Sequence, residues 1–195
     1  MTAAPTVAII FHSGYGHTAV VAQAVADGVT AAGGIATLHQ IEGPGQDFAE
    51  LLAAAAHADA IIFGAPTYMG DISAALKAFF EASSKAWMKL EWKDKIAGGF
   101  TNSLSFAGDK HHSLASIFTL AMQHGMIWVG TGVLPGAHSN TDAAPETINR
   151  LGYSVGVATQ SDNASPDITP PAGDRAFARD YGSRIVTITR QFKAA

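Results

Sequence analysis

The stretch that decides the fold is VAIIFHSGYGHT, residues 7–18. Its first five residues are all apolar, which is typical of a strand that is covered on both faces. Val21, Val25 and Val29 follow at a spacing of four and predict a helix, which Gly33 and Gly34 would end. A buried strand that leads through a glycine-containing loop into a helix is the opening unit of a parallel α/β sheet.

The same alternation continues along the chain. We predict further strands at residues 35–41, 60–64, 96–100 and 126–129, and helices around residues 48–55, 72–80, 114–121 and 177–192. Asp71 and Asp174 are the predicted N-caps of the helices at 72–80 and 177–192. Five β-α units imply a doubly wound parallel sheet with helices on both faces, within a single domain of residues 1–195.

Composition excludes several classes of protein. Of the 195 residues 48% are hydrophobic and 14% charged, which is not the composition of a disordered chain. The net charge is −4 and no run of Lys or Arg occurs, so we expect no nucleic-acid partner. The absence of cysteine rules out disulfides, iron–sulfur clusters and thiolate zinc sites, and it suits the cytoplasm. The first residues lack a basic segment, so we expect no signal peptide.

One segment is apolar enough to raise the question of a membrane span. No Asp, Glu, Lys or Arg lies between Lys110 and Asp142. Gln123, His124 and Gly125 sit at the middle of its most apolar part, where polar groups are expensive in a bilayer. We therefore predict a buried helix, a short connection and a buried strand, with no membrane insertion. Residues 130–171, rich in Gly, Pro, Asn, Asp and Ser, are then expected to form a long functional loop.

In doubly wound sheets the ligand binds beyond the carboxyl ends of the strands, which places the site at residues 12–18, 65–71 and 101–110. The first of these loops combines hydroxyls and glycines with the start of a helix, whose amides and dipole favour an anion. It contains no Lys or Arg, so a phosphate would be held by dipoles and neutral donors. The second loop is uncharged up to Asp71 and suits contact with an aromatic ring. The third loop is uncharged up to Asp109 and suits hydrogen bonds to the polar edge of such a ring.

Other phosphate ligands fit this loop less well. A Walker loop needs a lysine after the glycines, and none is present. Gly14-x-Gly16-x-x-Ala19 matches a loose dinucleotide fingerprint. That fingerprint expects an acidic residue about 20 positions further on, where Leu38, His39 and Gln40 stand. A dinucleotide-binding domain remains an alternative.

Four features taken together resemble a known family. They are the motif S-x-Y-G-H after the first strand, the motif G-x-P-T-x-x-G after the third, a Trp near the end of the next helix and a polar loop after the fourth strand. The chain resembles the flavodoxin-like FMN proteins, most closely the WrbA-type NAD(P)H:quinone oxidoreductases and the NADPH-dependent FMN reductases. The resemblance spans residues 7–192 and implies the strand order 2-1-3-4-5.

The resemblance also implies a set of site residues. The FMN phosphate would be held by Ser13, Gly14, Tyr15, Gly16, His17 and Thr18. The isoalloxazine would lie beside Pro66, Thr67, Tyr68, Met69 and Gly70, with its polar edge against Asn102, Ser103, Leu104, Ser105 and Phe106. Tyr15 would lie near the nicotinamide, Trp87 over the flavin at a subunit contact, and His124 on the substrate side as the catalytic residue.

His124 would reach a flavin only in another subunit, as in the tetramer, or a dimer, that the family implies. Taken alone, Trp87 beside Trp92 also fits a cluster covering the surface, and His124 fits a charged imidazole at a helix C-terminus. The adjacent His111 and His112 do not face one way on a helix, so we expect no metal site.

The implied activity is transfer of electrons from NADH or NADPH through FMN to a small quinone-like acceptor, by a ping-pong hydride mechanism. The sequence departs from the family pattern in two loops: Tyr68-Met69 replaces an Arg-Phe pair, and residues 102–107 replace a glycine-rich run. A flavodoxin-type electron carrier and a non-catalytic FMN-binding module are the alternatives.

Overall fold

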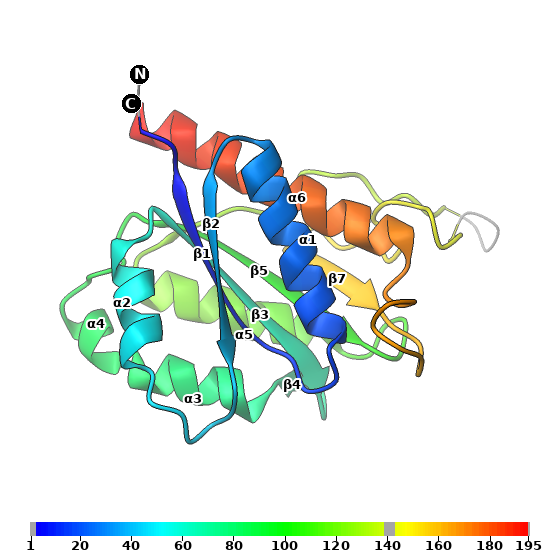
Figure 1. Cartoon of the computed structure of the whole chain (residues 1–195), viewed down its shortest axis with the longest axis horizontal. Helices are drawn as coiled ribbons and strands as arrows, with labels where there is room; N and C mark the ends of the chain where they lie inside the picture. The colour runs from blue at the N-terminus through cyan, green and yellow to red at the C-terminus, as the bar shows by residue number, and fades with distance from the viewer. Residues whose placement is uncertain (1–2, 139–142, 195) are drawn as a thin grey trace.

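The computed structural model describes residues 3–138 and 143–194. Its sheet runs in the order β2-β1-β3-β5-β6, and all pairings along this path are parallel (Figure 1). The strands are β1 (Thr6–His12), β2 (Ile35–Ile41), β3 (Ala60–Tyr68), β4 (Asp71–Ile72), β5 (Ile96–Ser103), β6 (Ile127–Trp128) and β7 (Val157–Gln160). The predicted flavodoxin-like fold is confirmed.

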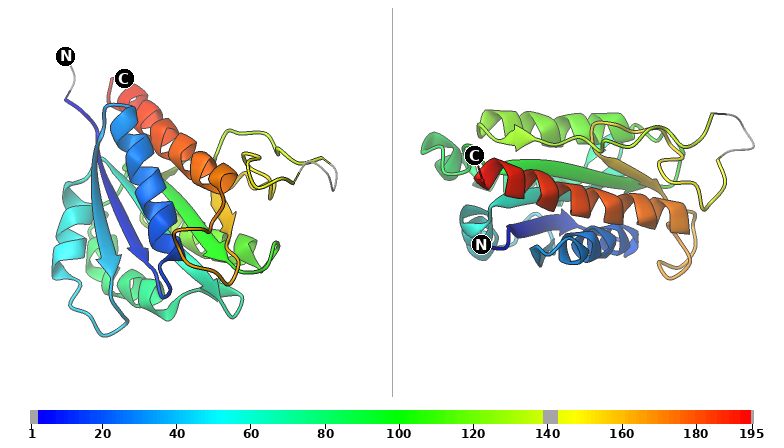
Figure 2. Two further views of the ribbon diagram at one scale, coloured as in Figure 1. Left: turned by 45° about the vertical axis from the view of Figure 1, so that its right-hand side comes forward. Right: turned by 90° about the horizontal axis from the view of Figure 1, so that it is seen from above.

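Helices cover both faces of the sheet (Figure 2). They are α1 (His17–Ala31), α2 (Ala49–His57), α3 (Ala74–Ala82), α4 (Ser84–Met88), α5 (Lys110–Gln123) and α6 (Ala172–Lys193). One hydrophobic cluster joins the sheet to α2, α3 and α5, and the other joins it to α1 and α6. The strands alternate between the clusters, with Ile10 in the first and Ile9 in the second, which is why their sequences are continuously apolar.

The fifth position of the sheet is shared by two short strands. β6 pairs with the start of β5 at Ile96 and Ala97, and β7 pairs with its end from Phe100 to Ser103. The sequence predicted one strand at 126–129 and a loop over 130–171, so the second half of that strand was missed inside the loop. Residues 139–142 of the predicted loop lie outside the described residues.

Two predicted helix caps are wrong. α3 is capped by Ser73, whose hydroxyl accepts a hydrogen bond from the Leu76 amide at 3.4 Å. Asp71 instead lies in β4, which folds back antiparallel on β3. α6 begins after Pro171, and Asp174 stands inside its first turn, buried against Arg150.

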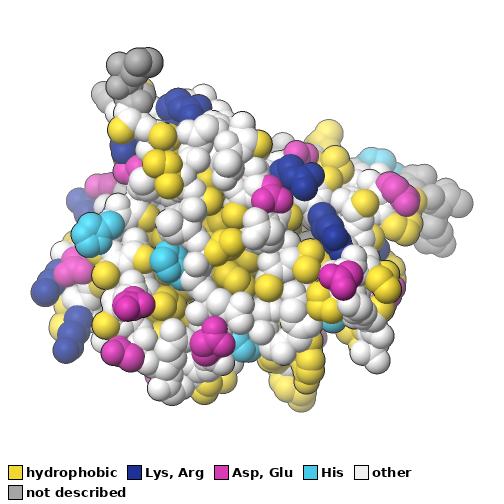
Figure 3. Space-filling model, viewed as in Figure 1, with side chains coloured by type: hydrophobic (Ala, Val, Ile, Leu, Met, Phe, Trp, Pro, Cys, Tyr) yellow, Lys and Arg dark blue, Asp and Glu magenta, His cyan; other side chains and the backbone are white. Residues whose placement is uncertain are grey.

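The apolar segment after Lys110 forms α5 and β6, in the predicted order, but β6 has only two residues and these are half-buried. Within the described ranges, no helix is long and apolar enough to cross a membrane. On the face shown in Figure 3, Lys and Arg side chains are scattered among acidic ones. Hydrophobic side chains gather at the lower edge of this face, over the turn between β3 and β4.

Candidate functional site

The first wall of the site is the turn from β1 into α1. Gly16 is the N-cap residue of α1 at φ 88°, and a Cβ there would lie 2.6 Å from Pro166 Cγ, so the position suits only glycine. The Ser13 hydroxyl accepts a hydrogen bond from the Ala19 amide at 3.1 Å and fixes the turn. The turn thus points the start of a 15-residue helix, with its free amides and positive dipole end, into the site.

The second wall is the end of β3, which is longer than predicted, so Pro66, Thr67 and Tyr68 lie in the strand. The Thr67 hydroxyl is 2.8 Å from the hydroxyls of Thr101 and Ser113, which fixes its rotamer. The Tyr68 hydroxyl packs against Gly14, leaving no room for a side chain there. Burial, with a smaller contribution from Tyr15, raises the pKa of Tyr68, while the Gly14 backbone partly offsets this.

The third wall is the end of β5, where Asn102 and Ser103 also lie in the strand instead of the loop. Asn102 Oδ1 accepts hydrogen bonds from the hydroxyls of Thr159 at 2.8 Å and Ser161 at 2.9 Å. These contacts fix the orientation of the carboxamide. They leave Nδ2 with no partner among the described residues, as a donor for a ligand.

The fourth wall, which the sequence did not single out, is the segment at residues 161–166 after β7. It is joined to the first wall by a hydrogen bond between His17 Nε2 and the Ala164 carbonyl, at 2.8 Å. A sequence signal for this wall does exist. The short segment Val157–Gln160 is followed by a polar turn that contains a proline, and this pattern is typical of a strand that leads into a site loop.

These walls enclose a pocket of about 470 Å³, within the range of small-molecule sites. The predicted site residues that line it are Tyr15, His17, Thr18, Pro66, Thr67, Tyr68, Asn102, Ser103 and Leu104. The other predicted residues of these loops lie beside the lining: Ser13, Gly14, Gly16, Met69, Gly70, Ser105 and Phe106. No Lys or Arg is among the described lining residues, and Asp162 is the acidic one.

Trp87 and His124 lie outside this pocket. They line a second pocket of about 590 Å³ between α3, α4 and α5. Trp87 is 48% exposed, whereas Trp92 is buried against Phe79, so the two tryptophans form no common surface cluster.

His124 is 1% exposed and its ring stacks on Trp92, with the centroids 4.1 Å apart. The Ser83 hydroxyl donates to the Phe80 carbonyl at 2.7 Å, so it accepts from His124 Nε2 at 3.0 Å. The proton is therefore on Nε2. Burial lowers the pKa of His124 to about 4, which makes the imidazole neutral and excludes the charged helix-end role.

Comparisons with known proteins give the family. The family model described as NADPH-dependent FMN reductase matches residues 13–141. The chain belongs to the NADPH-dependent FMN reductase family. Membership makes the chain an FMN-dependent NAD(P)H oxidoreductase, as the resemblance implied.

Relatives of this FMN reductase family member carry two kinds of name. Flavodoxin FldP from Pseudomonas aeruginosa is 41% identical over 187 residues, covering 95% of this chain and 97% of that one. An NAD(P)H dehydrogenase (quinone) from Solidesulfovibrio magneticus is 30% identical over 207 residues, covering 96% and 99%. The crystal structure of a WrbA-like flavodoxin from Agrobacterium tumefaciens matches with a TM-score of 0.77 and 39% identity, over 96% of this chain and 99% of that one.

The residues present fit the FMN that this family implies. The α1 terminus offers amides and the Thr18 hydroxyl to a phosphate without a cation nearby. At Gly14 and Gly16 a side chain would overlap Tyr68 or Pro166, so the two glycines allow the first wall to pack against the second and fourth walls. Asn102 Nδ2, which has no partner within residues 3–138 and 143–194, matches a ligand edge that carries acceptors.

Proposed function

We propose that the chain binds FMN in the 470 Å³ pocket and passes electrons from NADH or NADPH to a small quinone-like acceptor. The observation that carries this proposal is the meeting of the α1 N-terminus with the ends of β3, β5 and β7 in one pocket. The names of the quinone dehydrogenase relatives support the acceptor class. Residues 1–195 would act as a single domain, and the cysteine-free composition suits the cytoplasm.

The proposed contacts divide the cofactor among three walls. Ser13, Gly14, Tyr15, Gly16, His17 and Thr18 hold the phosphate through backbone amides and hydroxyls. Pro66, Thr67, Tyr68, Met69 and Gly70 form the wall beside the ring. The polar edge of the ring meets Asn102, Ser103, Leu104, Ser105 and Phe106.

The proposed reaction consumes NAD(P)H, a proton and a quinone and yields NAD(P)⁺ and the quinol. When bound, FMN supplies the group that takes up and gives off the hydride equivalent. The protein orients the two flat substrates in turn, which gives a ping-pong cycle. Tyr15, 78% exposed at the mouth of the pocket, is the proposed contact of the nicotinamide. None of the described lining residues is assigned the role of a general acid, and in this proposal solvent provides the proton.

The second pocket enters the proposal through a neighbouring subunit of a tetramer or dimer. Trp87 is exposed enough to pack over the flavin of another copy. His124 lies beneath that surface, so its proposed contact with the acceptor requires movement of the groups above it. A neutral imidazole with its proton on Nε2 would act there by hydrogen bonding.

A flavodoxin-type carrier is the second candidate. Large apolar side chains are exposed around the pocket, namely Tyr15, Met69, Leu104 and Phe106. Such a rim fits a protein partner as well as a flat substrate. The relative named flavodoxin FldP supports this candidate too.

Anaerobic mixing of the FMN-loaded protein with NADH or NADPH separates the two candidates. Rapid, saturable bleaching of the flavin absorbance, followed by recovery on adding a quinone, is the result expected of the oxidoreductase. Flavin that stays bound and yellow with both nucleotides would support the carrier or a non-catalytic binding module. Failure to load FMN would overturn the pocket assignment and favour the dinucleotide alternative.

A further inference from the structure

The segment Leu104-Ser105-Phe106 is held from behind by two buried side chains. Gln160 Nε2 donates to the Leu104 carbonyl at 2.9 Å. Lys110 Nζ donates to the Ser105 carbonyl and, at 3.1 Å, to the Phe106 carbonyl. Three consecutive carbonyls are thus bound by donors that come from β7 and from the first turn of α5.

This arrangement fixes the direction of the backbone amides. In a trans peptide the carbonyl and the next N–H point in opposite directions. Because the carbonyls of 104–106 point toward buried donors, the N–H groups of Ser105, Phe106 and Ala107 point to the exposed side of the loop. None of these three N–H groups donates to another described residue.

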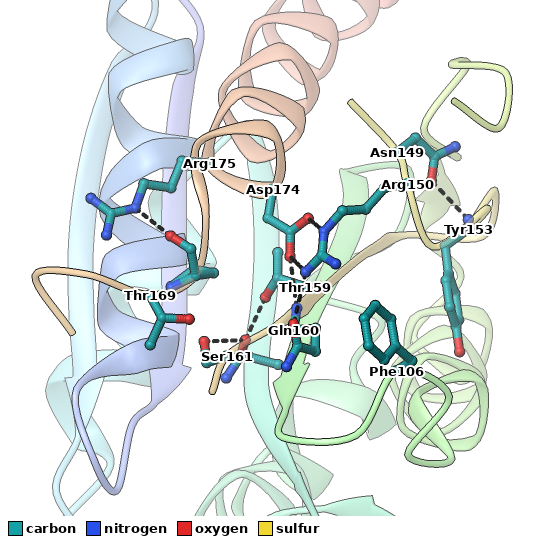
Figure 4. A network of polar contacts seen from close by, with 12 residues as sticks. Phe106, Asn149, Arg150, Tyr153, Thr159, Gln160, Ser161, Thr169, Asp174 and Arg175 are labelled. Carbon is teal, nitrogen blue, oxygen red and sulfur yellow. Dashed lines mark hydrogen bonds and ion pairs between the residues drawn. The ribbon is translucent and has the colours of Figure 1, made fainter. Parts of the chain in front are cut away.

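Gln160 is itself held in one orientation (Figure 4). Its Oε1 accepts from Arg150 Nη2 at 2.9 Å, and its second N–H donates to Asp162 Oδ1 at 2.8 Å. A flipped carboxamide would place its NH₂ against the guanidinium and its oxygen against two acceptors. Asp174 pairs with Arg150 Nε at 2.8 Å and accepts from the Gln160 amide at 2.7 Å, so the backbone of Gln160 is fixed as well.

The burial of Lys110 is explained by its hydrogen bonds to the Ser105 and Phe106 carbonyls. Its side chain is fully buried, an environment that is expensive for an ammonium group. Burial lowers its pKa to about 8, with Asp174 raising it and Arg150 lowering it. The two loop carbonyls are the hydrogen-bond partners that the structure gives its Nζ among the described residues.

We propose that Lys110 and Gln160 are positioning residues of the flavin pocket, which turn the N–H groups of Ser105, Phe106 and Ala107 toward acceptor atoms on the polar edge of the FMN ring. This inference rests on the proposed FMN site. Negative charge builds up on that edge when the ring is reduced, so the N–H groups favour the reduced cofactor. The two side chains therefore act on the midpoint potential as well as on affinity.

The test compares Lys110→Met and Gln160→Leu with the control Lys95→Met. Lys95 also donates to two carbonyls, those of Ala56 at 2.8 Å and Ala58 at 2.5 Å, but at the opposite end of β5. FMN affinity is measured by quenching of flavin fluorescence, the potential by redox titration, and protection of amides 105–107 by hydrogen exchange with and without FMN.

We expect Lys110→Met and Gln160→Leu to weaken FMN binding about tenfold and to remove the protection that FMN confers on amides 105–107. The reduced cofactor should lose about tenfold more affinity than the oxidised one, equivalent to about 30 mV for a two-electron couple. The control should match the unsubstituted protein in all three measurements.

Unchanged affinity, potential and protection in the variants would overturn the inference while leaving the proposed function intact. Failure of the unsubstituted protein to bind FMN would instead overturn the proposed function. If Lys110→Met does not fold, Gln160→Leu alone decides, because it removes the contact to the Leu104 carbonyl from a different element.

Discussion

The backbone oxygen of Val25 occupies the place where a Cβ on Gly182 would stand. A second glycine, Gly28, faces the Arg179 carbonyl of α6 in the same way. Helices α1 and α6 therefore touch along their backbones, and both positions require glycine because backbone atoms cannot move aside as a flexible side chain can.

Gly182→Ala is expected to destabilise the protein by about 1–3 kcal/mol, because the added methyl group forces the two helices apart. Urea denaturation at pH 7.5 measures the free energy of unfolding. Gly43→Ala is the control, since apart from its chain neighbours no described residue lies within 4 Å of a Cβ there, and its effect should stay within about 0.5 kcal/mol. Equal effects of the two substitutions would contradict the backbone contact.

Asp174→Asn should lower the free energy of unfolding by about 3 kcal/mol, because it leaves the Arg150 guanidinium buried without a countercharge. The matched control is Asp27→Asn, in an exposed pair whose partner Arg179 is 3.9 Å away. That pair contributes little in water, so a change below about 1 kcal/mol is expected. A small effect at Asp174 would show that the guanidinium finds another partner or water.

Stability should fall on acidification because of His124. Its pKa is about 4 in the folded chain and near 6.5 when unfolded, so between these values the unfolded state binds the extra proton. The contribution of the neutral His124 imidazole to the free energy of unfolding is complete above pH 6.5 and is lost as the pH falls toward 4. At pH 5 the loss amounts to about 2 kcal/mol.

Comparing unfolding at pH 7.5 and pH 5.0 in the unsubstituted protein and in His124→Gln isolates this effect. Burial also lowers the pKa of His12 and His39, but their effect on the pH dependence of unfolding is the same in both proteins and cancels in the comparison. His57→Gln, on the surface of α2, should retain the full pH dependence. A His124→Gln protein that loses as much stability on acidification as its parent would refute the neutral, buried state.

Gly16→Ala should weaken FMN binding at least tenfold, because the left-handed backbone and the contact with Pro166 together exclude a methyl group. Fluorescence titration of the apoprotein measures the dissociation constant. Gly45→Ala, in open space, should leave it unchanged. Equal affinity of the two variants would argue against phosphate binding at the α1 terminus.

The core and the first three walls were predictable because local patterns determine them. The apolar run at residues 7–11 and the glycines after it indicate a buried strand and a candidate ligand loop without help from distant residues. Their predicted places, and the fold class, agree with the structure.

What escaped prediction depends on contacts between distant residues. Val157–Gln160 is too short to show a period and becomes a strand only because β5 extends far enough to pair with it. Asp and Ser are both common N-cap residue types, so the sequence alone does not choose between Asp71 and Ser73. The pairing of β4 with β3 takes up Asp71 and leaves Ser73 as the N-cap of α3. Asp174 resembles a cap in sequence, but Arg150, 24 positions earlier, binds it inside the helix.

The contact between α1 and α6 also has a consequence for synthesis. These helices comprise residues 17–31 and 172–193, so α1 leaves the ribosome long before the helix that covers it. Until α6 has been synthesised, the second hydrophobic cluster lacks the side chains that α6 contributes to it, among them Phe177, Tyr181 and Ile185. Packing of α1 against its partner helix therefore waits until α6 has been synthesised, and chaperones that bind apolar segments can engage α1 during the interval between the two helices.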